Sequence, residues 1–173
     1  MDRLAADEHL ALKADSRFHG EVAILRYANK DVRLLKPLTY VNESGRAVQA
    51  LAAYYRIPPE HILVVHDEID LAPGAVRLKV AGGHGGHNGL RSIVGALGSS
   101  AFLRLRVGIG HPGAAALVTP YVLSAAPPDQ GRLIEDAMVS ALDLLPRLLA
   151  GETAPVMQLL NTRPPRADAP KPA

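Results

Sequence analysis

The sequence predicts a single α/β domain with three layers, α/β/α, in which helices cover both faces of a mixed central sheet. Three observations support this prediction. Strand-like and helix-like segments alternate along the 173 residues. One short segment is wholly apolar and β-branched, as in a strand covered on both faces. No linker divides the chain, and its length fits one domain with a buried core.

The first part of the chain predicts two helices with a β-hairpin between them. Leucines among good helix formers indicate the first helix, and two runs of strand formers joined by a polar turn indicate the hairpin. Apolar residues at helical spacing indicate the second helix, which Pro58 and Pro59 end. The expected elements are a helix over 2–13, strands over 21–28 and 32–36, and a helix over 44–56.

The remainder of the chain predicts three strands and three helices. The wholly apolar run ILVV gives the first strand, and two further segments alternate apolar and polar residues. Pro146 is expected to kink a long amphipathic helix near its end. The expected elements are strands over 62–65, 75–80 and 102–109, and helices over 90–97, 128–150 and 153–161. The Pro-rich tail over 163–173 is expected to be disordered.

The charges are unevenly distributed, although the net charge is only +2. The stretch 71–128 contains five cationic residues and no Asp or Glu. These cations are Arg77, Lys79, Arg91, Arg104 and Arg106. Such a basic block in an otherwise neutral body is typical of a surface that attracts a polyanion such as nucleic acid, although ordinary solvated surface residues would give the same pattern.

The composition excludes several classes of protein. The chain has no cysteine, which excludes disulfides, thiol nucleophiles and thiolate metal sites. No apolar run approaches the roughly 20 residues of a membrane span. Residues 1–10 are acidic and lack the apolar stretch of a signal peptide. We therefore expect a cytoplasmic protein that does not enter the membrane.

The segment 82–89, GGHGGHNG, is the most unusual stretch of the sequence. Its five glycines leave the backbone N–H groups open, but it lacks the Lys-Ser/Thr ending of a phosphate-binding P-loop. His84 and His87 are two possible metal ligands, yet no third ligand is suitably spaced, and a plain flexible connection is an alternative. We favour a mobile lid that meets a ligand, with Asn88 at the start of the following helix.

Polar side chains also follow the wholly apolar strand. His66, Asp67 and Glu68 come directly after it, at the end where open α/β sheets bind ligands. A carboxylate at this place can orient a histidine from elsewhere in the chain. The alternative is an acidic loop that pairs with arginines.

Two further motifs are weaker. GIGHPG, at 108–113, matches a dinucleotide-binding pattern, but Pro112 lies inside the turn and no acid is placed to bind a ribose. The hypothesis that the protein is a nucleotide-binding module has no support other than this match. Tyr40 and Asn42 lie in a polar loop, where asparagine commonly makes only local hydrogen bonds.

Together these segments resemble the bacterial peptidyl-tRNA hydrolase family over about 1–161. The matching segments are LLKPLTYVNESGRAV (34–48), ILVVHDEIDLAPGAVRLKVAGGHGGHNGLRSI (62–93), FLRLRVGIGHPG (102–113) and PYVLSAAPP (120–128), in that order. The pairing of HDE with GGHGGHNG at this spacing is specific. The resemblance implies a domain over 1–162 that hydrolyses the ester between peptide and tRNA, which recycles tRNA from stalled or abandoned translation. It implies a monomer with peptidyl-tRNA as its partner and with no metal or cofactor.

The resemblance also implies roles for individual residues. Asp67 matches the aspartate that orients a histidine general base, which takes a proton from water. Asn42 and Asn88 match substrate-binding asparagines, and Tyr40 matches the aromatic residue beside the first of them. Arginines of the basic block would contact tRNA phosphates. The expected contributors are Arg104 and Arg106.

One part of the family pattern has no counterpart in these segments. The family opens with a buried strand, a Gly-Asn-Pro-Gly loop and Thr-Arg-His-Asn-x-Gly, whose histidine is the general base. Residues 1–5 match the helix after that histidine, so we expect the domain to lack the family's first strand and its base. Two hypotheses follow. One is an esterase whose sequence starts too late or is a fragment, and the other is a tRNA-binding protein without catalysis.

Overall fold

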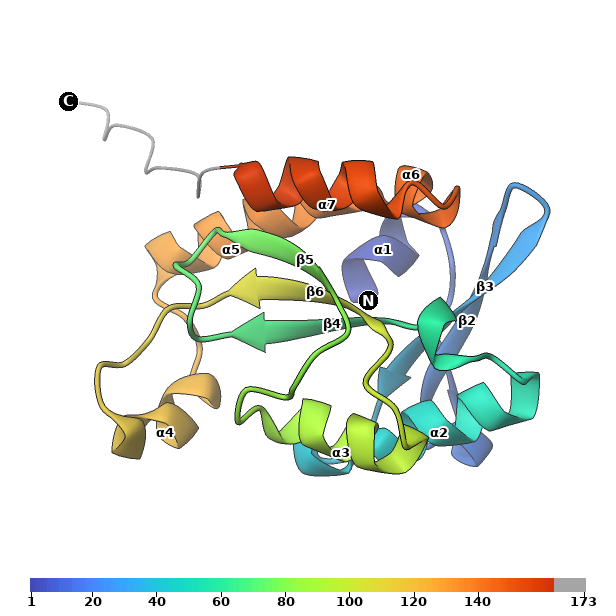
Figure 1. Ribbon diagram of the computed structural model, residues 1–173, viewed down its shortest axis with the longest axis horizontal. Coiled ribbons are helices and arrows are strands. Elements are labelled where there is room, and N and C mark those ends of the chain that lie inside the picture. The colour runs from blue at the N-terminus through green and yellow to red at the C-terminus, as the bar shows by residue number, and fades with distance from the viewer. Residues whose placement is uncertain (164–173) are drawn as a thin grey trace. The chain divides into compact units, whose positions relative to one another are not determined.

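The computed structural model describes residues 1–163, and the expected disordered tail lies outside them except for Arg163 (Figure 1). The chain divides into two units. One consists of residues 1–62 and 80–103, and the other of residues 63–79 and those from 104 onward. Helices and strands are interspersed along the described residues, and the strands form two three-stranded sheets. The α/β class is therefore confirmed, with its strands divided between two small sheets.

The first unit contains an antiparallel sheet with strand order β1-β2-β3. Its strands are β1 (Lys13–Asp15), β2 (Gly20–Tyr27) and β3 (Lys30–Pro37). The predicted hairpin is confirmed, and its register runs from Gly20 opposite Pro37 to Tyr27 opposite Lys30. Ala28 and Asn29 form the turn, both with positive φ, which matches the twist of the strands.

The N-terminal helix of this unit is shorter than the sequence predicts. α1 (Asp2–Asp7) ends well before residue 13, because the chain turns at His9 and then pairs as β1 with the edge of β2. A hydrogen bond of 2.7 Å from Lys36 of β3 holds the carboxylate of Asp2 and lowers its pKa. The turn at His9 and the pairing of Lys13 with Val22 thus override the helical propensity of this segment.

Two longer helices complete the first unit, α2 (Ser44–Tyr55) and α3 (Asn88–Leu97). Both agree closely with the predicted ranges. α2 buries Ala47, Leu51 and Ala52 on one face and ends at Arg56, whose positive φ terminates the helix just before Pro58. A short 3-10 turn, η2 (Val41–Glu43), leads directly into α2.

The second unit contains a mixed sheet with strand order β4-β6-β5. Its strands are β4 (Leu63–Glu68), β5 (Val76–Val80) and β6 (Leu103–Gly108). Backbone hydrogen bonds from Leu103 to Ile62 and from Ile109 to Glu68 show that β6 runs parallel to β4. Bonds from Gly108 to Ala75 and from Ala81 to Phe102 show that it runs antiparallel to β5. The predicted mixed sheet is confirmed, although Val65 is exposed and β4 is therefore not covered on both faces.

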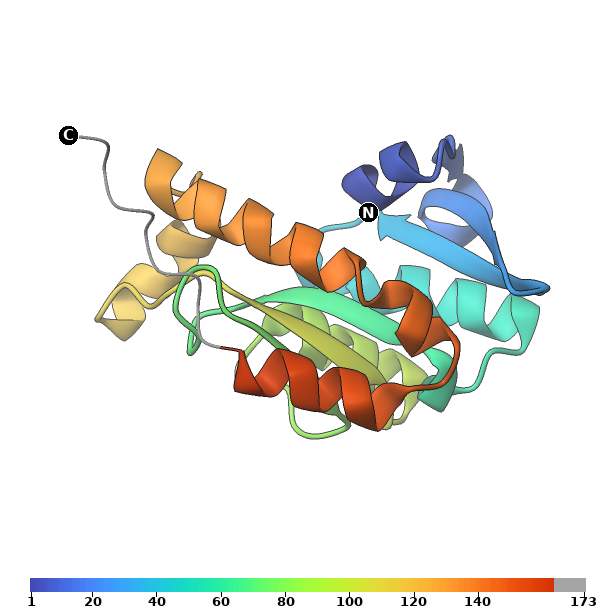
Figure 2. The same cartoon turned by 90° about the horizontal axis from the view of Figure 1, so that it is seen from above.

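Four α-helices follow β6 within the described residues of this unit. They are α4 (Val118–Val122), α5 (Pro128–Leu142), α6 (Leu145–Leu149) and α7 (Thr153–Thr162). Val76 and Leu78 of β5 pack with alanines of α5 and with Val156 and Leu160 of α7, so α5 and α7 cover the sheet (Figure 2). The predicted long helix is divided before Pro146, close to the expected kink. No described helix has the length and apolar character needed to cross a membrane.

The end of α7 is fastened to the edge strand β5 by side chains. The amide of Asn161 accepts a hydrogen bond from the backbone N–H of Leu78 and donates one to its C=O, both at 3.0 Å. Arg77 donates to the C=O of Leu160 at 3.0 Å, in the last turn of α7. The amide of Asn161 therefore takes the place of a neighbouring strand.

Asn161→Leu is expected to lower the free energy of unfolding by about 2 kcal/mol, because both backbone groups of Leu78 lose their partner. Urea unfolding would measure the change. Gln158→Leu makes a similar substitution on the exposed face of α7 and should have almost no effect. An equal loss in the two variants would show that the amide does not hold the helix on β5.

Candidate functional site

In the first unit, α2 and α3 lie side by side and run in the same direction (Figure 1). Three contacts of increasing residue number show this direction. They are Val41 with Gly89, Gly45 with Ser92, and Gln49 with Ala96. Because the helices are parallel, their first turns lie at the same end of the pair.

This end of the helix pair carries three of the predicted site residues. Asn42 lies in η2 directly before α2, and Asn88 is the first residue of α3; both are exposed. Tyr40 precedes η2 and is 81% exposed. The structure thus brings the two amides and the ring onto neighbouring segments, and it confirms the predicted place of Asn88 at a helix start.

The glycine-rich loop of this unit ends at the same helix start. The Nδ1 atom of His87 accepts a hydrogen bond of 3.2 Å from the N–H of Leu90 and so caps α3. His84 likewise accepts at Nδ1 from Gly86 at 3.1 Å. In the neutral form of each ring, the proton is therefore on Nε2. An added Cβ at Gly83, Gly85 or Gly86 would meet nothing within 4 Å, so the loop backbone is open.

Neither histidine of the loop belongs to a metal cluster in the described residues. Within residues 1–163, no group of three or more His, Cys, Asp or Glu side chains is placed to hold a metal ion. The Nδ1 atoms of His84 and His87 are already occupied by backbone N–H groups of the loop. The geometry of these rings therefore suits loop structure and helix capping better than metal binding.

In the second unit, the three ionisable residues His66, Asp67 and Glu68 lie within β4, not after it as predicted. The hydrogen bonds of β6 continue as far as Glu68 and extend the strand past the apolar run. The Nδ1 atom of His66 lies 2.7 Å from the backbone C=O of Asp67 and donates to it. Asp67 is half-buried, and its side chain points to the opposite face from its neighbours.

Of the two arginines predicted to contact phosphates, Arg106 is paired with Glu68 and Arg104 is buried. Arg106 donates a hydrogen bond of 2.9 Å to Glu68, so the charges of both are paired. Arg104 is 2% exposed, and its burial, followed by the nearby charge of Arg106, lowers the pKa of its guanidinium. A side chain buried this deeply cannot reach a phosphate without moving. The burial of Arg104 therefore argues against a direct phosphate contact by this residue, whereas Arg106 is half-buried and its expected contact stays a prediction.

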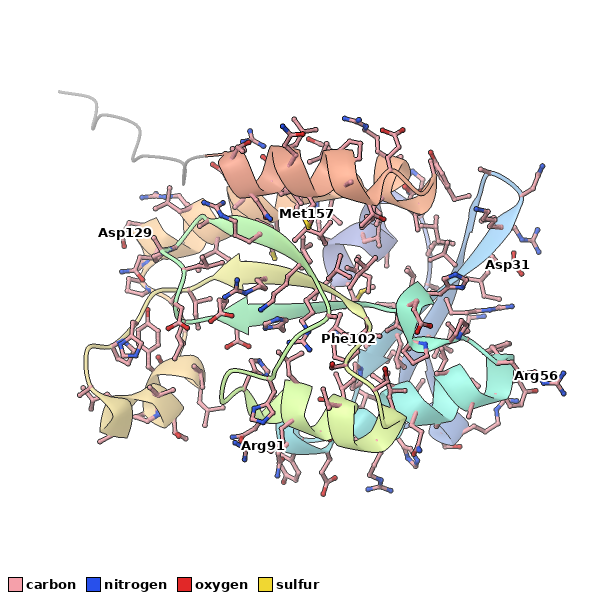
Figure 3. The ribbon with its side chains drawn as sticks, viewed as in Figure 1. Asp31, Arg56, Arg91, Phe102, Asp129 and Met157 are labelled. Carbon is pink, nitrogen blue, oxygen red and sulfur yellow. The ribbon has the colours of Figure 1, made fainter. Side chains whose placement is uncertain are left out.

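Arg91 is an exposed cation of the basic block that was not among the expected phosphate contacts. Arg91 lies on α3, three residues after Asn88, and extends away from the helix (Figure 3). Side chains three apart share a helix face, so the spacing alone places Arg91 on the side of Asn88. This spacing was the signal that could have identified it.

The comparisons with known proteins agree with this architecture. A family model described as peptidyl-tRNA hydrolase matches residues 1–168. The peptidyl-tRNA hydrolase of Halorhodospira halophila is 54% identical over 150 residues, which are 87% of this chain and 77% of that protein. The peptidyl-tRNA hydrolase of Methylococcus capsulatus is 52% identical over 161 residues, or 93% of this chain and 86% of that protein.

A solved structure shows the same fold. The crystal structure of peptidyl-tRNA hydrolase from Acinetobacter baumannii covers 95% of this chain with a TM-score of 0.91 and 43% identity, and the match spans 84% of that chain. The fold and the matched motifs define a hydrolase of mixed α/β architecture. The chain belongs to the peptidyl-tRNA hydrolase family.

Proposed function

We propose that this protein hydrolyses the ester bond between the peptide and the tRNA of peptidyl-tRNA, and so recycles tRNA from stalled or abandoned translation. The observation that carries the proposal is the family match over residues 1–168, which includes every segment with a candidate site residue. We place the hydrolase domain at 1–162 and propose that it acts in the cytoplasm as a monomer. The matching relatives and the solved structure are named peptidyl-tRNA hydrolases, which supports catalysis over a tRNA-binding protein without it.

The proposed reaction needs a base, a group that orients it, and donors for the developing negative charge. We propose that Asp67 has the role of the aspartate that accepts a hydrogen bond from the histidine general base and holds it in the useful tautomer. The segments of this chain that match the family motifs do not include that histidine. The base takes a proton from water, and the water oxygen attacks the ester carbonyl carbon. When the tetrahedral intermediate collapses, the bond to the ribose oxygen breaks and that oxygen receives the proton. The products are a peptide with a free carboxylate and a tRNA with a free hydroxyl.

The first unit offers groups that can bind the substrate. Asn42 and Asn88 carry exposed amides at the shared end of α2 and α3, where each N–H can donate to a carbonyl or ribose oxygen. The exposed ring of Tyr40 offers an aromatic face beside Asn42. We assign substrate binding to these three residues, and a lid function to the loop that carries His84 and His87.

The activity is tested on the protein translated from its own gene, with any codons ahead of Met1 included. A tRNA that carries a labelled peptide is the substrate, and release of the label is followed over time. We expect release of the peptide with an intact tRNA as the second product. Tight binding of tRNA without any release would instead establish the alternative of a binding protein.

Binding of tRNA is expected to weaken as salt increases, because each phosphate contact releases counterions and contributes about 0.7–0.9 to the log–log slope. Arg91→Gln should lower the affinity and reduce this slope by about one contact. Arg56→Gln removes an exposed arginine from the other end of the same helix pair and is the matched control (Figure 3). An identical slope in the two variants would exclude Arg91 as a phosphate contact.

A further inference from the structure

We propose that Gly45 and Ser92 form a helix junction that sets the distance between Asn42 and Asn88, which makes both of them positioning residues for hydrolysis. This inference rests on the proposed function and assigns residues that act through the two asparagines. The hydroxyl of Ser92 binds the start of α2, and the absence of a side chain at Gly45 lets the two helices approach closely. We define the Gly45–Ser92 junction as these two residues and their contact.

The junction is a close approach of backbones. A Cβ atom added at Gly45 would lie 2.2 Å from the backbone O of Ser92 and 2.6 Å from its carbonyl carbon. Both atoms belong to the backbone of α3, so no side-chain rotation could relieve the overlap. Only glycine therefore permits α2 and α3 to lie this close.

A hydrogen bond holds the junction together. The backbone N–H of Gly45 donates to Oγ of Ser92 at 2.9 Å. Gly45 is the second residue of α2, where the N–H has no partner within its own helix. The hydroxyl of Ser92 therefore caps α2 from the neighbouring helix, which ties the start of α2 to a fixed point on α3.

Contacts on either side of the junction fix the same alignment. Toward the helix starts, a Cβ at Gly89 would lie 3.1 Å from Cγ1 of Val41, so η2 also packs closely on the first turn of α3. Toward the helix ends, the side-chain amide of Gln49 donates to the C=O of Ala96 at 2.7 Å. α2 can therefore not slide along α3 without breaking one of these contacts.

The two asparagines lie about one helical turn from the junction. Asn42 precedes Gly45 by three residues, and Asn88 precedes Ser92 by four. A wider separation at the junction would move one amide away from the other with little change elsewhere in the unit. A displacement of about 1 Å at a reacting centre can reduce the rate about 10²-fold, so the junction is expected to influence catalysis strongly.

The proposal is tested with Gly45→Ala, and Gly95→Ala is the matched control. Gly95 also lies in α3, but a Cβ there would meet nothing within 4 Å. Gly45→Ala is expected to lower kcat about 10²-fold, whereas Gly95→Ala should leave both kcat and KM unchanged. Ser92→Ala removes only the hydroxyl and should give a smaller loss. If Gly45→Ala does not fold, Ser92→Ala is used in its place.

A mutant cycle separates positioning from simple loss of structure. In the Asn42→Ala, Asn88→Ala background, Gly45→Ala should change the remaining rate by less than about twofold, because the groups that it misplaces are already absent. If the losses instead multiply in full, Gly45 does not act through the asparagines and the proposal is wrong. Wild-type kcat in Gly45→Ala would overturn it equally.

A measurement without substrate keeps the inference separate from the proposed function. Because the chain has no cysteine, Glu43→Cys and Arg91→Cys can carry two nitroxide labels at chosen places on the helix pair. Gly45→Ala should lengthen the distance between the labels, and Gly95→Ala should leave it unchanged. If the protein released no peptide, the proposed function would fail, but the label distance would still decide the junction. An unchanged distance in Gly45→Ala would overturn it.

Discussion

Asn88→Ala is expected to slow hydrolysis of peptidyl-tRNA about 10²–10³-fold, and Asn42→Ala is expected to act in the same way. An amide that donates to the developing oxyanion stabilises the transition state by about 2.7–4 kcal/mol in a well-organised site. Single-turnover release of the peptide measures this loss without interference from product release.

The substitution at Asn88 should leave the fold intact. Its side chain is exposed, and the cap of α3 is supplied by His87, so the helix start does not depend on the amide. Asn29→Gly removes an exposed amide from the hairpin turn of the same unit and should keep full activity. Wild-type turnover by Asn88→Ala would remove Asn88 from the active site.

Leu78→Ala is expected to lower the free energy of unfolding by about 2–5 kcal/mol. Leu78 is 1% exposed and packs among residues of α5 and α7 in the core of the second unit. Truncation of Leu78 removes the transfer free energy of the deleted carbon atoms and leaves a cavity whose lining loses van der Waals contacts. Tm should fall by about 2–4 °C for each kcal/mol of lost stability.

Val80→Ala is the matched control for Leu78→Ala. Val80 lies two residues further along β5 and is 52% exposed, so its truncation should cost less than about 1 kcal/mol. Thermal unfolding of both variants makes the comparison. If the two losses were equal, the side chain of Leu78 would not be part of the packed core.

The sequence predicted most elements of the fold because their signals are local. Strand formers around a polar turn are enough to define the β2-β3 hairpin, and Pro58 is enough to end α2. Where prediction failed, pairing with another strand decided the structure. Pairing with β2 turned Lys13–Asp15 into a strand, and pairing with β6 carried β4 through Glu68.

The candidate site was predictable in part for the same reason. The positions of Asn42 and Asn88 at helix starts follow from nearby polar and glycine residues. The burial of Arg104 was not predictable, because alternation along a strand separates two faces without telling which one the fold covers. Similarly, only three-dimensional packing shows that Gly45 lies against the backbone of Ser92.

The mixed sheet of the second unit has a consequence for the order of folding. β4 is bonded to β6, so the pairing of these strands closes a loop that runs from Ile62 to Leu103. Closing so long a loop is entropically costly, whereas the β2-β3 hairpin closes through two residues. Hydrogen exchange after a pulse of refolding should therefore protect the amides of β2 and β3 early and those of β4 late. During that interval the unpaired edges of β4 and β6 are exposed to aggregation.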